Sequence, residues 1–195
     1  MGSLTDPVTT ASRTLRDKMA ISVSDTSPPS HAGLSWKDPA ALAEYISGYT
    51  DGEGCFSVSI WRRPRLYVGW EARPSFSVCQ KQGKGNVLKL IRDYFGCGSI
   101  RPSSTDGTDH YETRSVHDLI AKIIPHFERY PMLSTKQQDF ERFKEICGIV
   151  ATGAHLRVSG LRQILQHTLL MTYLSPKRKK KLWTLSQLSP KRIKV

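Results

Sequence analysis

The chain has 195 residues, 38% of them hydrophobic and 24% charged, and its formal net charge is +12 at pH 7. A chain of this length can bury one sizeable core, and it contains no run of about 18 apolar residues that would predict a membrane span. Its four cysteines, at positions 55, 79, 97 and 147, form no CxxC pair, which argues against a zinc ribbon or a redox motif.

The positive charge is concentrated at the C-terminal end. Residues 174–195 hold eight basic and no acidic side chains, whereas residues 35–173 hold eighteen basic and fourteen acidic ones. A basic tail over 175–195 suits a polyanionic partner, most simply nucleic acid, although a merely solvated tail has the same composition. The run Pro176–Lys181 also resembles a nuclear localisation signal; contact with phosphate is the interpretation we favour.

A helix is predicted at the start of the folded part. Residues 1–34 are rich in Ser, Thr and Pro, show no sustained period and predict a flexible leader. Asp38-Pro39 is typical of a helix start, because Asp can cap free amides and Pro suits the first helical position. Apolar residues then recur at i, i+3, i+4 and i+7 from Leu42, and we expect the helix to end near Glu53-Gly54.

Two β-hairpins, each followed by helical sequence, are predicted next. Alternating apolar residues indicate strands over 55–61 and 66–80, and a second hairpin over 99–103 and 110–113 turns at Asp106-Gly107. Helices are expected over 86–96, over 116–130 with a break at Pro125, and over 134–150. The predicted order is therefore α-β-β-α-β-β-α-α, with a further helix over 161–174 before the tail.

The end of the first helix carries the most informative motif, a single nonapeptide over residues 46–54. Gly48 and Gly52 are four residues apart, with Ser47 and Asp51 as a second small or acidic pair beside them. Small residues at this spacing let two helix backbones approach closely. Since no second copy of the motif occurs, we expect the partner helix to come from a second identical chain across a two-fold axis.

That symmetry predicts a metal site. Two Glu53 carboxylates would lie near each other at the paired helix ends, which is unfavourable without a cation. Oxygen ligands favour Mg²⁺ over zinc.

The nonapeptide, and the two hairpins and helices that follow it, resemble the LAGLIDADG homing endonucleases over about residues 36–150. The resemblance implies an α+β fold, αββαββα with an antiparallel DNA-binding saddle sheet, and extra helices at the C-terminal end. It implies one endonuclease domain over 35–174 between the leader and the tail.

The resemblance also implies roles for individual residues. Glu53 is similar to the metal-binding acid of the family, Gly52 offers its main-chain carbonyl to the metal, and Asp51 is structural at the base of the interface helix. Gln80 would position water near the scissile phosphate, and Lys136 would stabilise the developing charge on it. Thr135 and Gln137 flank Lys136 where many members have a second basic residue. Judged without the resemblance, Gln80 and Lys136 read as an exposed strand end and a helix surface residue.

The polar face of the predicted sheet is the candidate DNA surface, because the major groove admits a two-stranded ribbon. The same alternation is equally typical of any half-exposed sheet. The predicted contacts are Ser57, Ser59, Trp61, Glu71, Arg73, Ser75, Ser77, Lys81, Arg101, Ser103, His110 and Glu112, with phosphate contacts from Arg62, Arg63, Arg65, Lys177, Arg178 and Lys179.

Together these features predict a homodimeric, Mg²⁺-dependent DNA endonuclease that cuts both strands of a long pseudo-palindromic site and leaves 3′ overhangs. The alternative is an RNA-binding intron maturase, or a non-catalytic DNA-binding regulator, on the same fold. The resemblance implies an intron-encoded origin in an organelle, a bacterium or an archaeon, with nuclear import through the tail as a lesser alternative.

Overall fold

The computed structural model describes residues 38–83, 86–103 and 105–186, so the predicted leader and the last nine residues lie outside the described part. Its first element is helix α2 (Pro39–Glu53), followed without a loop by strand β1 (Gly54–Arg62). The chain continues through β2 (Trp70–Lys81), α3 (Val87–Phe95), β3 (Ser99–Pro102) and β4 (Thr108–Thr113). This order and the α+β class confirm the prediction.

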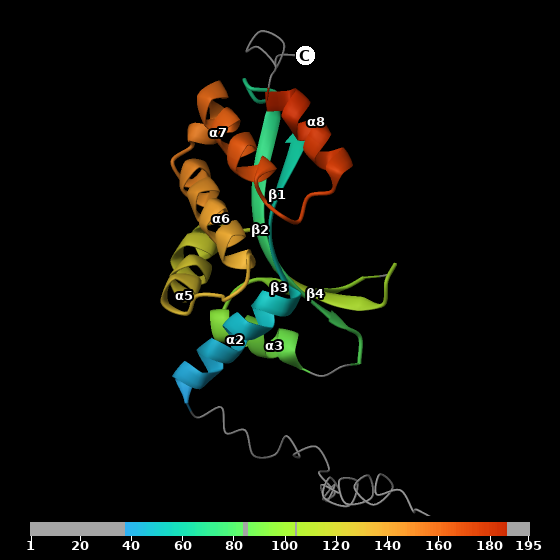
Figure 1. Cartoon of the computed structure of the whole chain (residues 1–195), viewed down its shortest axis with the longest axis vertical. Helices are drawn as coiled ribbons and strands as arrows, with labels where there is room; N and C mark the ends of the chain where they lie inside the picture. Colours follow the sequence, from blue (N-terminus) through green and yellow to red (C-terminus); the bar gives the residue numbers. More distant parts are fainter. Residues whose placement is uncertain (1–37, 84–85, 104, 187–195) are drawn as a thin grey trace, which may run out of the picture. The chain divides into compact units, whose positions relative to one another are not determined.

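The four strands form one antiparallel sheet in the order β1-β2-β4-β3. Helices follow as α4 (Val116–Asp118), α5 (Ile124–Arg129), α6 (Lys136–Ala151), α7 (Val158–Leu169) and α8 (Pro176–Ser186). Figure 1 shows α5, α6 and α7 along one side of the long β1–β2 hairpin, with α8 beside β1. Within the described residues, no helix is both long and apolar enough to cross a membrane.

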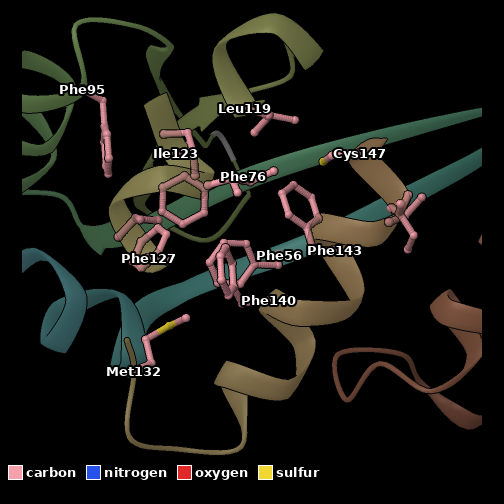
Figure 2. Packing of buried hydrophobic residues seen from close by; sticks show 14 of the residues in the cluster. Phe56, Phe76, Phe95, Leu119, Ile123, Phe127, Met132, Phe140, Phe143 and Cys147 are labelled. Atoms are coloured by element: carbon pink, nitrogen blue, oxygen red, sulfur yellow. The ribbon is translucent and has the colours of Figure 1, made fainter. Parts of the chain in front are cut away.

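An aromatic core joins the sheet to α5 and α6 (Figure 2). The rings of Phe56 and Phe76 stack across β1 and β2 with centroids 5.1 Å apart, and Phe127, Phe140 and Phe143 pack around Phe56 at 5.2 to 5.4 Å. Such ring pairs add to the free energy gained by burying the side chains. Phe56 and Val58, two of the alternating apolar residues of the strand predicted over 55–61, are both buried.

The predicted break at Pro125 takes the form of a π-helical turn over Leu119–Ile123. Ile124 donates its main-chain N–H to the carbonyl of Leu119, and α5 begins at once with Pro125 in its first turn. Proline has no N–H to donate, so a change of helical pitch just before it keeps the neighbouring groups bonded.

Three features differ from the prediction. The helix expected over 161–174 is α7, which ends at Leu169. The second strand begins at Trp70 rather than at residue 66, because Arg63 and Gly69 close a loop through a 2.7 Å main-chain hydrogen bond. Residues 176–186, expected to be tail, form the amphipathic helix α8, whose Leu182 and Leu185 are buried. They belong to a second apolar cluster with Val68, Leu161, Leu165 and Leu174.

Strand β1 is an edge strand, and residues near α8 cover part of its free edge. The Val58 main-chain N–H donates to the Tyr173 hydroxyl at 2.9 Å, and that hydroxyl donates back to the Val58 carbonyl at 3.0 Å. Arg178 donates to the same carbonyl at 3.3 Å. These contacts satisfy main-chain groups that an open edge would leave free.

Candidate functional site

The end of α2 is held by Asp51. Its carboxylate accepts hydrogen bonds from the main-chain N–H groups of Leu133, at 3.2 Å, and Ser134, at 3.1 Å, and also from the Ser134 hydroxyl. The carboxylate thereby ties the last turn of α2 to the segment that leads into α6. An acid that accepts three hydrogen bonds from its own chain is a structural group at this position.

Lys136, the first residue of α6, caps the same helix end. Its Nζ donates to the carbonyls of Thr50 at 2.9 Å and Gly52 at 3.4 Å. Burial lowers the pKa of Lys136, although Asp51, Cys55 and Glu53 nearby oppose this. The cation complements the negative end of the helix dipole and lies beside the carbonyl predicted to bind metal.

Glu53 and Gln80, distant in sequence, line one hollow of about 390 Å³ together with Tyr49, Cys79, Lys81 and Thr108. Glu53 is exposed, and its carboxylate accepts no hydrogen bond from the residues that the structure describes. Lys136 does not line this hollow, because its amine turns to the α2 carbonyls. The structure thus brings two of the three predicted catalytic side chains to one place and the third to the adjacent helix end.

The donor set at this helix end suits a hard divalent cation only in part. Glu53 and the Gly52 carbonyl provide oxygen atoms alone, as Mg²⁺ prefers. Among the described residues, no group of three or more His, Cys, Asp or Glu side chains is placed to hold a metal. One chain therefore supplies a fitting but incomplete set of ligands.

The outer face of α2 is open at the two glycines. Apart from the neighbouring backbone of α2, a Cβ atom built on Gly48 or Gly52 would meet no atom of the described structure within 4 Å. A hollow of about 360 Å³ lies along this helix, and Leu133 at its rim is 97% exposed. A second helix that packed on this face could cover both the exposed Leu133 and the bare surface at Gly48. Leu133 could not be identified from the sequence, because its exposure depends on how the loop before α6 turns.

Ser47, predicted at the same interface, bonds instead to its own chain. Its hydroxyl is buried and donates to the Tyr130 carbonyl at 2.7 Å, so it accepts from His126 Nε2 at 3.1 Å. The other ring nitrogen of His126 lies 2.9 Å from the Tyr94 hydroxyl, and burial lowers the pKa of His126 to about 4. Positions 47 and 51 form the α2 stripe next to the glycines, and this stripe faces α5 and the loop before α6.

The sheet register places the predicted DNA-facing residues of the four strands on one face, opposite the core. These are Ser57, Ser59 and Trp61 in β1, Glu71, Arg73, Ser75, Ser77 and Lys81 in β2, Arg101 in β3, and His110 and Glu112 in β4. Ser103 follows β3 directly. Alternation alone therefore predicted which side chains share the face.

Several of these polar groups already have partners on the face. Glu71 forms ion pairs with Arg63 at 2.8 Å and with Arg73 at 3.0 Å. Slight burial alone would raise the pKa of Glu71, but the two arginines outweigh it and lower that pKa. Ser75 is buried, with its hydroxyl 2.9 Å from that of Ser57. Arg62 and Arg65 are exposed beside the β1–β2 connection. A base contact by Glu71 would have to compete with two ion pairs.

Three basic residues of α8, Lys177, Arg178 and Lys181, lie beside β1. Arg178 donates to the Val58 carbonyl and lies 5.8 Å from the centre of the Tyr173 ring, but the residue is exposed and lines the same hollow as Lys177 and Lys181. Lys177 and Lys181 line a hollow of about 770 Å³ beside Ser59 and Trp61 of β1. Lys181 was not among the predicted contacts, although it belongs to the same lysine run.

Comparison with known proteins gives one consistent result. The model of a family described as LAGLIDADG endonuclease matches residues 46–147. The chain is 30% identical to homing endonuclease I-ApeII from Aeropyrum pernix, over 74% of this chain and 86% of that protein. It is also 30% identical to probable intron-encoded endonuclease 2 of Neurospora crassa, over 83% of this chain, but spans only 35% of that relative's length.

Solved structures agree. The crystal structure of the homing endonuclease I-TnaI superposes with a TM-score of 0.68 at 30% identity, covering 74% of this chain and 97% of that one. The LAGLIDADG homing endonuclease I-LtrWI, solved bound to its target DNA, gives 0.69 at 28% identity and covers 74% of this chain and 49% of that one.

Proposed function

Because the chain belongs to the LAGLIDADG endonuclease family, we propose that it is a homing endonuclease that hydrolyses both strands of a specific, long duplex target. The observation that carries the proposal is the Glu53 carboxylate, exposed at the end of α2 and sharing one hollow with Gln80 at the end of β2. An acid left without a hydrogen bond by its neighbours in the described structure is of little use to folding and available for chemistry.

The active form in this proposal is a homodimer. One chain carries one copy of the motif, and the open face at Gly48 and Gly52 can take the same face of a second copy. Leu133 would be covered in the same contact. Two-fold symmetry then favours a pseudo-palindromic target and brings the two Glu53 side chains together.

Residues of both copies would hold Mg²⁺, with Glu53 and the Gly52 carbonyl as the contribution of each chain. When bound, the ion would lower the pKa of the attacking water and stabilise the leaving oxygen. Lys136 keeps the Gly52 carbonyl in place and adds positive charge at the helix end where phosphate charge develops. The Gln80 amide, on the same hollow as Glu53, would orient the attacking water.

The polar face of the sheet would lie along the major groove, with Arg62, Arg65 and the lysines of α8 on phosphates. Cleavage would then fall across the minor groove between the two half-sites and leave 3′ overhangs. The name of the Neurospora crassa relative supports an intron-encoded origin, and we propose that the host compartment is an organelle or a prokaryotic cell.

The test is incubation of the full chain with a randomised duplex library and Mg²⁺, followed by sequencing of the cut ends. We expect one family of pseudo-palindromic sites with cuts offset to give 3′ ends, and no cutting when EDTA replaces Mg²⁺. Selection of a bound sequence that is never cut would refute the nuclease and support a DNA-binding regulator.

A further inference from the structure

Four polar side chains at the end of the β2–β4 pair form one continuous hydrogen-bond chain beside the candidate site. Cys79 Sγ lies 3.0 Å from His110 Nδ1, and His110 Nε2 lies 2.7 Å from Thr108 Oγ1. Thr108 Oγ1 donates to Asp106 Oδ1 at 2.6 Å, and the Thr108 main-chain N–H donates to the same oxygen at 3.1 Å. The four residues link β2 to the turn of the β3–β4 hairpin.

The donor and acceptor of every hydrogen bond in this series follow from the ionisation of Asp106. Hydrogen bonds from Thr108 and Ser103 lower the pKa of Asp106 to about 2, so its carboxylate is ionised and can only accept. The single hydroxyl proton of Thr108 therefore goes to Asp106, and the Thr108 oxygen must accept from His110. His110 Nε2 carries the ring proton, and in the neutral ring Nδ1 is left bare.

Cys79, at the other end of the hydrogen-bond chain, is consistent with that tautomer. A bare Nδ1 needs a donor, and burial raises the pKa of the Cys79 thiol, which keeps its proton. The S–H group of Cys79 thus donates to His110 Nδ1. Both ring nitrogens of His110 are engaged, so the imidazole has no free edge to offer a base.

The hydrogen-bond chain lies at the end of β2 that carries Gln80. Cys79 opposes His110, Gln80 opposes Asp109, and Lys81 opposes Thr108 in the last pairs of the ladder. Cys79 and Thr108 line the same hollow as Glu53 and Gln80. Beyond the last pair, the Gln82 main-chain N–H donates to the Gly107 carbonyl at 3.0 Å, and side-chain bonds across the pairs further limit fraying of this strand end.

We propose that Cys79, His110, Thr108 and Asp106 form a directional chain that fixes the Gln80 end of β2, and that Cys79 and His110 are positioning residues for cleavage. The inference rests on the proposed function. It reassigns His110, predicted from the sequence as a base contact, to holding the two hairpins together.

The tautomer can be measured without any cleavage. Long-range ¹H–¹⁵N correlation spectra of the full chain with ¹⁵N-labelled histidine, assigned with His110→Gln, should give the pattern of a ring protonated at Nε2 and bare at Nδ1. The opposite tautomer would reverse the order of donors and overturn the proposal, whatever the nuclease activity.

The positioning role is tested by single-turnover cleavage and duplex affinity measured separately on the selected target. Cys79→Val removes the S–H donor at similar volume, and we expect about tenfold slower cleavage with less than about twofold change in Kd. Cys79→Ser keeps a donor and should restore most of the rate. Thr108→Val removes the hydroxyl that links His110 to Asp106 and should slow cleavage in the same way. This second variant still tests the proposal if Cys79→Val folds poorly.

His110→Gln should slow cleavage in the same way as Cys79→Val. His117→Gln is its matched control, because His117 is exposed on α4 and lies outside the hydrogen-bond chain. It should cleave at the rate of the unchanged protein. If Cys79→Val and Thr108→Val also cleave at that rate, the positioning role is wrong while the proposed function stands. If the unchanged protein cuts no duplex, the proposed function fails instead.

Discussion

The last turn of α2 and the middle of β1 are both held by contacts between residues that are far apart in the sequence. They differ in whether a polar group nearby remains without an internal hydrogen bond. At β1, Tyr173 and Arg178 satisfy the free main-chain groups of Val58. At α2, Asp51 and Lys136 make similar internal bonds, but Glu53 two residues on accepts none within the described structure. Internal bonding identifies groups that stabilise the fold, whereas the acid without such bonds is the group that we propose for catalysis.

Glu53→Gln is the change expected to have the largest effect on this contrast. It removes the charge that would bind metal and should slow cleavage by about 100- to 1,000-fold while duplex binding and thermal stability stay unchanged. Glu145→Gln, an exposed acid on α6, is the matched control and should behave as the unchanged protein. Retention of cleavage by Glu53→Gln would remove the acid from the site.

The contact between α2 and α5 should weaken in acid. The pKa of His126 is about 4 in the folded chain against an ordinary 6.5, so the unfolded chain binds the proton more readily. Its contribution to stability is therefore complete above about pH 6.5 and is lost as the pH falls towards 4, by up to about 3 kcal/mol. Denaturant unfolding of the unchanged chain and of His126→Gln between pH 7 and 4 should show a shallower loss for the variant, and parallel curves would contradict this.

Tyr173→Phe tests the edge of β1. The change leaves the buried Val58 N–H without its acceptor, so we expect a loss of about 2 kcal/mol in the free energy of unfolding. Cleavage at a temperature where the variant is folded should be nearly unchanged. A specific loss of catalysis without loss of stability would mean that this edge does more than support the sheet.

Asp51→Asn sharpens the comparison inside α2 itself. It is the same chemical change as Glu53→Gln at a carboxylate that accepts hydrogen bonds from Leu133 and Ser134. We expect a loss of about 1 kcal/mol of stability, read from denaturant midpoints, because the amide keeps one acceptor oxygen. Unaltered stability would show that the internal bonds of Asp51 contribute little.

The smallest effect is expected from Lys177→Gln combined with Lys181→Gln. These side chains flank the β1 end of the sheet, and their loss should reduce the salt dependence of duplex binding by about two units of log Kd against log salt. Arg157→Gln with Arg162→Gln is the charge-matched control away from the sheet face. Charge substitution is a cleaner test than truncation after Leu174, which would also remove the buried Leu182 and Leu185.

Periodicity predicted those parts of the fold that depend on neighbouring residues. The bounds of α2, the two hairpins and the shared face of the sheet follow from stripes and alternation that are visible in the sequence. The stripe from Leu42 and the alternation around Phe56 were enough to place the motif at a helix end and the polar residues on one surface.

Long-range contacts could not be predicted in the same way. Helix α8 has only Leu182 and Leu185 as buried positions among lysines, and their partners Val68 and Leu161 lie far away in the sequence. Likewise, the spacing of the motif could not tell which of two adjacent α2 stripes faces α5, and so could not show that Ser47 is bonded within its own chain.

Gly54 allows a tight junction in which α2 passes directly into β1. The helix ends at Glu53 and the strand starts at the next residue, and a Cβ at Gly54 would lie only 2.7 Å from the Thr50 carbonyl oxygen. No residue separates the two elements, so we expect a displacement of β1 in the proposed DNA complex to shift the Glu53 carboxylate as well. In that case a poorly matched duplex would be bound with Glu53 out of line for cleavage, and fidelity would be set at hydrolysis as well as at binding.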